Sequence, residues 1–134
     1  MSQDTKNVSF TDNLTRLQLV SLDACTRCME CLQWCPVLDV TGDETLTTPE
    51  KIRIYGELVR SQHGLGAKLF GRPEIAPEVL EKLTQALFSC TTCGRCGEVC
   101  SVGINTQRLW PAMRAKMVEL GVGPIDGQRE MPRI

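Results

Sequence analysis

The sequence is poor in the residues on which many enzymes and nucleic-acid-binding proteins depend. Its 134 residues include one histidine, one tyrosine, two tryptophans and three phenylalanines. A single histidine, His63, nearly excludes a catalytic set based on imidazole. The formal net charge is −1, from 15 basic and 16 acidic residues, which argues against nucleic acid as a partner. The sequence also lacks G-x-G-x-x-G and P-loop patterns, so it shows no sign of a flavin, nicotinamide or nucleotide site.

Long apolar runs are absent as well. The apolar runs extend for only a few residues, whereas a helix that spans a bilayer needs about 20. The first residues, Met-Ser-Gln-Asp-Thr-Lys-Asn, have no apolar segment or cleavage site of an export signal. We therefore expect a cytoplasmic protein with no membrane span. No paired carboxylates suggest general acid–base chemistry, so we expect no active site within this chain.

Cysteine, by contrast, is abundant and regularly placed. Eight cysteines form two copies of the spacing C-x-x-C-x-x-C-x-x-x-C: Cys25, Cys28, Cys31 and Cys35, then Cys90, Cys93, Cys96 and Cys100. In a reducing cytoplasm such spacings indicate metal binding rather than disulfides. Soft thiolates at short range are the ligands of iron–sulfur centres, and this spacing is typical of proteins with two [4Fe–4S] clusters. The pattern therefore predicts two clusters and the transfer of single electrons.

Zinc is the main competing interpretation of the cysteines. Two four-cysteine zinc sites would also use eight thiolates, in a zinc-stabilised interaction module. Zinc modules usually carry two C-x-x-C pairs separated by a longer stretch, which favours iron–sulfur clusters here. Pro36 follows the first run and fixes a change of chain direction, whereas Ser101 follows the second run and leaves a less rigid turn. Neither residue is a ligand. Arg27 and Arg95, each directly before a cysteine of its run, are either solvated or serve to offset the cluster charge or to dock a partner.

The segments around the two runs have helical patterns and no strand alternation. Three helices are predicted: one with Thr47 or Thr48 as N-cap and apolar residues at Ile52, Tyr55 and Val59, one opened by Ala76-Pro77-Glu78, and one capped by Asn105 or Thr106 and stopped by Gly121. Pro111 indicates that the last of these either begins near Trp110 or kinks there. Three glycines and a proline predict a loop over residues 64–73. Residues 11–22 fit a short helix or an extended arm.

The cysteine runs and their surroundings resemble a known family. Cys-Thr-Arg-Cys-Met-Glu-Cys-Leu-Gln-Trp-Cys-Pro at 25–36, Cys-Thr-Thr-Cys-Gly-Arg-Cys-Gly-Glu-Val-Cys at 90–100 and the helical insert between them look like the small, C-type iron–sulfur subunit of heterodisulfide reductase. This resemblance implies an all-α, α-helical ferredoxin fold around two [4Fe–4S] clusters. It places an irregular N-terminal arm at 1–21, the two-cluster domain at 22–120 and an irregular C-terminal tail at 121–134.

The resemblance also implies ligands and partners. Cluster 1 takes Cys25, Cys28, Cys31 and Cys100, and cluster 2 takes Cys90, Cys93, Cys96 and Cys35. In the family this small iron–sulfur protein is not catalytic itself. It relays electrons between a flavin-bearing subunit and a catalytic subunit that acts on disulfides at CCG motifs. This sequence has neither a flavin site nor a CCG motif. A freely diffusing two-cluster ferredoxin-type carrier is the alternative.

Overall fold

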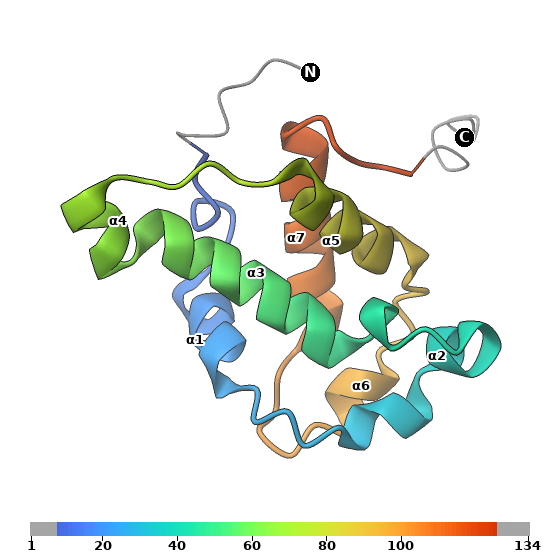
Figure 1. Ribbon diagram of the computed structural model, residues 1–134. Coiled ribbons are helices and arrows are strands. Elements are labelled where there is room, and N and C mark those ends of the chain that lie inside the picture. The colour runs from blue at the N-terminus through green and yellow to red at the C-terminus, as the bar shows by residue number, and fades with distance from the viewer. Residues whose placement is uncertain (1–7, 126–134) are drawn as a thin grey trace.

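The computed structural model describes residues 8–125, and all the regular structure in this range is helical (Figure 1). The elements are α1 (Arg16–Ala24), η2 (Glu30–Trp34), α2 (Pro36–Thr41), η3 (Glu44–Leu46), α3 (Thr48–His63), α4 (Leu65–Phe70), α5 (Pro77–Ser89), α6 (Arg95–Glu98) and α7 (Thr106–Glu119); η2 and η3 are 3₁₀ turns. The predicted all-α class is confirmed. None of the helices between residues 8 and 125 has both the length and the apolar character needed to cross a membrane.

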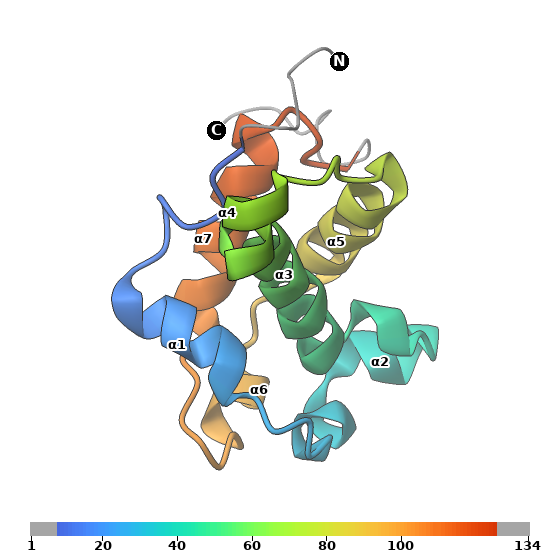
Figure 2. The same ribbon diagram turned by 60° about the vertical axis from the view of Figure 1, so that its left-hand side comes forward.

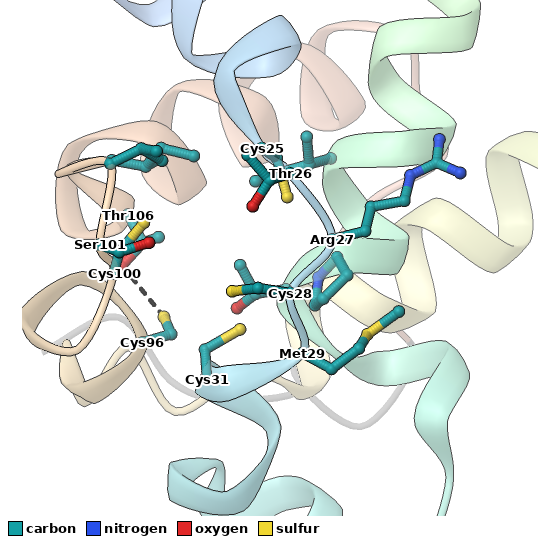
Figure 3. A pocket seen from close by; sticks show the side chains of 15 residues that line it. Cys25, Thr26, Arg27, Cys28, Met29, Cys31, Cys96, Cys100, Ser101 and Thr106 are labelled. Atoms are coloured by element: carbon teal, nitrogen blue, oxygen red, sulfur yellow. Dashed lines mark hydrogen bonds between the residues drawn. The ribbon is translucent and has the colours of Figure 1, made fainter.

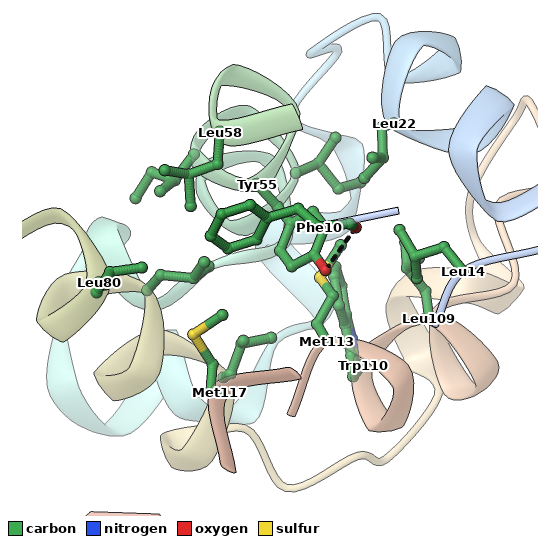
Figure 4. Close-up of a cluster of buried hydrophobic side chains, with 14 of the residues drawn as sticks. Phe10, Leu14, Leu22, Tyr55, Leu58, Leu80, Leu109, Trp110, Met113 and Met117 are labelled. Atoms are coloured by element: carbon green, nitrogen blue, oxygen red, sulfur yellow. Dashed lines mark hydrogen bonds between the residues drawn. The ribbon is translucent and has the colours of Figure 1, made fainter. Parts of the chain in front are cut away.

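Helices α3, α5 and α7 pack around the apolar core, with α1 against α3 (Figures 1 and 2). Tyr55 of α3, Leu83 of α5 and Met113 of α7 are all fully buried there. The Tyr55 ring meets the Phe10 ring edge to face, with 5.8 Å between centroids, and its hydroxyl donates to the Phe10 carbonyl at 3.0 Å (Figure 4). The apolar periodicity of the sequence therefore identifies the faces that meet in the core.

The three predicted helices are present with the expected starts. Thr47 is the N-cap of α3, Pro77 is the first residue of α5, and the Asn105 side chain accepts from the Arg108 N–H at 3.2 Å at the start of α7. Gly121, with φ of 74°, follows the end of α7 as predicted.

Of the two alternatives for Pro111, a helix that begins only near Trp110 is wrong, because α7 begins at Thr106 and Pro111 lies inside it. Proline loses one backbone hydrogen bond in a helix. Three of the side chains around it, Leu109, Trp110 and Met113, are at most 1% exposed. Their burial offsets that loss.

Two further expectations need correction. Residues 64–73 are not a continuous loop, because Leu65–Phe70 form α4 with Gly64 as N-cap. Glycine propensity is a weak prior, and the Lys68 N–H donates to the Gly64 carbonyl at 3.3 Å, which closes the first turn of α4. Residues 16–21 are helical rather than irregular, because the side chain of Thr15 and that of Gln18 cap the start of α1 reciprocally.

The N-terminal segment before α1 packs on the helices. Phe10 and Leu14 are buried, and the Phe10 N–H donates to Nε2 of His63 at 3.3 Å. His63 is therefore a structural partner of this segment rather than a plain surface residue. The division into an arm, a domain and a tail stays a prediction, and residues 126–134 of the predicted tail lie outside the described part. In the described part of the tail, the Val122 and Gly123 N–H groups both donate to the Met117 carbonyl. These two hydrogen bonds fix the direction in which the chain leaves α7.

Candidate metal centre

The cysteines occupy the ends of helices and the short turns between them. Cys25 follows α1, Cys31 lies in η2, Cys35 precedes α2, and Cys90 follows α5. Cys96 lies in α6, which packs against η2. Figures 1 and 2 show these segments together at one end of the molecule, beyond the ends of α3 and α7. The two runs, far apart in the sequence, therefore meet in space.

Five cysteines line one pocket at this end: Cys25, Cys28, Cys31, Cys96 and Cys100 (Figure 3). The remainder of its wall includes Met29, Pro49, Ile52 and Ile104, and none of the described residues that line it is a carboxylate or a histidine. A set of soft thiolates without carboxylates beside them suits an iron–sulfur cluster. The residues present therefore fit the predicted cofactor.

The pocket gathers the four cysteines predicted for cluster 1 and adds Cys96, which is predicted for cluster 2. Cys35, Cys90 and Cys93 do not line it. Residues 8–125 contain no group of three or more histidine, cysteine or acidic side chains placed to hold a single metal ion. The division of the eight ligands between two clusters stays a prediction.

The backbone of the two runs repeats an unusual conformation. Arg27 and Met29 have φ of 56° and 64°, and Thr92 and Gly94, at the equivalent places of the second run, have φ of 54° and 79°. Positive φ is rare for residues other than glycine, and it turns backbone N–H groups inward in concave turns that bind anions. The Thr92 N–H accordingly donates to Sγ of Cys90 at 3.4 Å. An alignment of the two runs pairs Arg27 with Thr92 and Met29 with Gly94, so the equivalence of these positions is visible in the sequence.

Burial controls the protonation of the central thiol. Removal from water raises the pKa of Cys31 to about 11, and the neighbouring Cys96 adds to this rise. The neutral thiol is therefore favoured unless a cation compensates the thiolate. Coordination to metal supplies that compensation, because the ligand is the deprotonated sulfur.

Arg114 of α7 binds the backbone at the start of the second cysteine run. Its guanidinium donates to the Leu87 carbonyl at 2.7 and 2.9 Å and to the Cys90 carbonyl at 2.6 Å, and it lies over the Phe88 ring at 5.5 Å. These bonds fix the end of α5 where the run begins. No sequence pattern marks this role, because Arg114 lies 24 residues from Cys90.

The side chains around the runs differ in exposure. Trp34 is 48% exposed, so it does not belong to the apolar core. Phe88, by contrast, is partly buried and packs against that core. Arg27 and Arg95 are both exposed. Either solvation or docking of a partner remains open to them.

Residues 21–104 match the family described as the 4Fe-4S dicluster domain. The chain belongs to this family. It is an iron–sulfur protein of electron transport, and its cofactors are two [4Fe–4S] clusters. The thiol-lined pocket is the part of the structure in which this family membership is visible.

The chain is similar in sequence to subunits of heterodisulfide reductases and related oxidoreductases. It is 41% identical over its whole length to the D-type subunit of dihydromethanophenazine:CoB–CoM heterodisulfide reductase from Methanosarcina barkeri, of which it covers 33%. It is 31% identical, over 79% of its length, to the Hdr-like menaquinol oxidoreductase iron-sulfur subunit of Archaeoglobus profundus, of which it covers 20%. It is 25% identical, over 84% of its length, to the B-type subunit of fumarate reductase (CoM/CoB) from Methanothermobacter marburgensis, of which it covers 21%. The chain thus spans about a third or less of each relative. No solved structure gives a significant match.

Proposed function

We propose that this domain relays electrons between a flavin-bearing subunit and a CCG-motif subunit that acts on a disulfide, in a heterodisulfide-reductase-like complex. The observation that carries the proposal is the convergence of thiols from both cysteine runs on one pocket. The subunits of related enzymes that the chain resembles support the same assignment. When bound, [4Fe–4S] clusters accept and release single electrons.

We further propose the division of ligands that the resemblance implies. Cys25, Cys28, Cys31 and Cys100 hold cluster 1, and the other four cysteines, Cys35, Cys90, Cys93 and Cys96, hold cluster 2. Four of the five pocket cysteines fit the first set. Thiolates of this kind are maintained in a reducing compartment, so we place the protein in the cytoplasm.

In the proposed relay, catalysis takes place on other polypeptide segments. The sequence contains no CCG motif and no dinucleotide-binding loop, so the flavin and the disulfide chemistry belong elsewhere. The D-type relatives are about three times as long as this chain. We propose that the role of this domain matches the electron-relay part of such proteins, in the manner of the small C-type iron–sulfur protein.

Anaerobic purification and electron transfer test the proposal. We expect about eight irons and eight sulfides per chain, and reversible reduction by artificial dyes without turnover of a disulfide. Native co-purification with a flavoprotein and a CCG-motif protein supports the relay. A chain that elutes alone with both clusters supports the freely diffusing carrier instead. A folded, colourless protein loaded with zinc contradicts both.

Exchange of single ligands tests the crossed arrangement. Cys35→Ala should damage the cluster held by the second run and leave the first-run cluster intact. Cys100→Ala is the matched variant and should do the reverse. Site-resolved spectroscopy that finds the opposite assignment contradicts the crossing but leaves the two-cluster relay in place.

A further inference from the structure

Thr106 has the only side-chain hydroxyl that is hydrogen-bonded to a cysteine sulfur in the part of the chain that the structure describes. Its Oγ1 lies 3.1 Å from Sγ of Cys96, and the residue is 1% exposed (Figure 3). Thr106 is the first residue of α7, so no carbonyl of its own helix lies one turn before it. The hydroxyl therefore has the Cys96 sulfur as its partner.

The backbone of α6 leaves room for this contact. A methyl group added at Gly97 would lie 2.9 Å from Oγ1 of Thr106 and 3.3 Å from the Ile104 carbonyl oxygen. Gly97 does not need a positive φ. Its lack of a side chain is thus explained by the close approach of Thr106 beside Cys96.

The direction of the hydrogen bond changes when Cys96 binds iron. In the free protein the Cys96 thiol donates to Oγ1 of Thr106. Coordination releases the thiol proton to solvent, and the thiolate that remains is only an acceptor. The Thr106 hydroxyl would then donate a hydrogen bond to the sulfur.

Such a bond favours the reduced cluster. One added electron increases the negative charge on the ligand sulfurs, and a hydrogen bond to a charged acceptor strengthens with that charge. Hydrogen bonds to sulfur are among the factors that set the reduction potentials of iron–sulfur clusters. The equivalent sulfur of the first run, Cys31, receives no side-chain hydroxyl within residues 8–125. The two runs therefore differ in this respect despite their identical spacing.

We propose that Thr106 raises the reduction potential of the cluster to which Cys96 is a ligand, by donating a hydrogen bond to the Cys96 sulfur. This inference rests on the proposed function, because it takes Cys96 as a ligand, but it holds whichever cluster Cys96 joins. In a two-cluster chain, the residue would favour residence of the electron on that cluster. Thr106 is a positioning residue rather than a catalytic one.

The test is a redox titration of the anaerobically purified full chain, followed by electron paramagnetic resonance. Thr106→Val keeps the shape of the side chain and removes the hydroxyl. At a fixed ambient potential we expect the ratio of reduced to oxidised protein to fall about tenfold at one cluster, which is about 59 mV for one electron, and to stay unchanged at the other. Thr106→Ser keeps the hydroxyl and should titrate like the parent chain.

Thr84 of α5 provides a matched control. It is also buried, at 3% exposure, and its hydroxyl has no hydrogen-bond partner among the described residues. Thr84→Val should leave both potentials unchanged. A Thr106→Val chain with two intact clusters and unchanged potentials overturns the inference and leaves the relay standing.

Two further outcomes are decisive. If Thr106→Val and Thr106→Ala lose a cluster that Thr106→Ser retains, the hydroxyl is needed for assembly, and the role in tuning the potential is overturned. If the parent chain itself contains no redox-active iron, the proposed function fails first, and the inference fails with it.

Discussion

Helices α3, α5 and α7 each bury at least five residues, whereas η2, α2 and α6, which carry or adjoin the cysteines, bury none. One end of the molecule is thus held by apolar packing. The other end has turns, positive φ angles and thiols in place of a core. Small domains often replace missing core with metal. The comparison teaches that the two ends depend on different interactions and should fail separately.

Removal of the clusters should have the largest effect, and only at one end. We expect a chelator under reducing conditions to abolish hydrogen-exchange protection in residues 25–46 and 90–104, because metal ligation supplies the folding free energy there. Amides of α3, α5 and α7 should keep measurable protection, because most of the residues in their core lie outside the pocket, with Ile52 and Ile104 shared between the two. Uniform loss of protection along the chain would contradict the division into two ends.

A cavity in the core should weaken the other end. Leu83 is fully buried, so Leu83→Ala should lower the free energy of unfolding of the helical end by about 2–5 kcal/mol. Denaturant titration followed by circular dichroism measures this loss, and iron content before denaturation should match that of the parent chain. Leu69→Ala is the control, because Leu69 is 68% exposed and its truncation should change stability little.

Arg114 joins the two ends, so its loss should affect both. Arg114→Met leaves the Leu87 and Cys90 carbonyls without their charged donor and should destabilise the chain by about 3 kcal/mol. We also expect faster release of iron to a chelator. Arg108→Met on the same helix is the control, because the Arg108 side chain is exposed. Equal rates of iron release in the two variants would show that Arg114 does not support the site.

Helices whose starts depend on residues close together in the sequence could be predicted, and features that depend on other interactions could not. The starts of α3, α5 and α7 depend on local caps, prolines and apolar periodicity, and they are predictable from the sequence. The helix at 65–70 is not, because its glycines favour a loop and none of its residues is buried, so no apolar periodicity marks it.

At the site, the regular spacing of the cysteines indicates the chemistry, and family membership confirms the two clusters. The contacts that support the site could not be predicted from the sequence. Thr106 meets Cys96 across 10 residues, and Arg114 meets Leu87 across 27. No local pattern marks such pairs, because they arise only when α7 packs beside α5 and α6.

The smallest predicted effect compares the two runs directly. Met29 and Gly94 occupy equivalent positions with positive φ, which costs a residue other than glycine about 1 kcal/mol. Met29→Gly should therefore raise stability by about 0.5 kcal/mol, after the entropy of the unfolded glycine is subtracted. Gly94→Ala should lower it by about 1 kcal/mol, since the new methyl group would also displace the Gln107 side chain. Shifts of the same sign in thermal unfolding would contradict the equivalence of the runs.

The meeting of Cys25 and Cys100 in one pocket has a consequence for the unfolded chain. A cluster bonded to both would close a covalent loop over residues 25–100, much as a disulfide does. By the chain-entropy relation for cross-links, a loop of this length removes conformational freedom worth about 4–5 kcal/mol from the unfolded state. Oxygen that destroyed the cluster would then open this loop at the same moment. Oxidative damage would end electron transfer and release the polypeptide to proteolysis in one event.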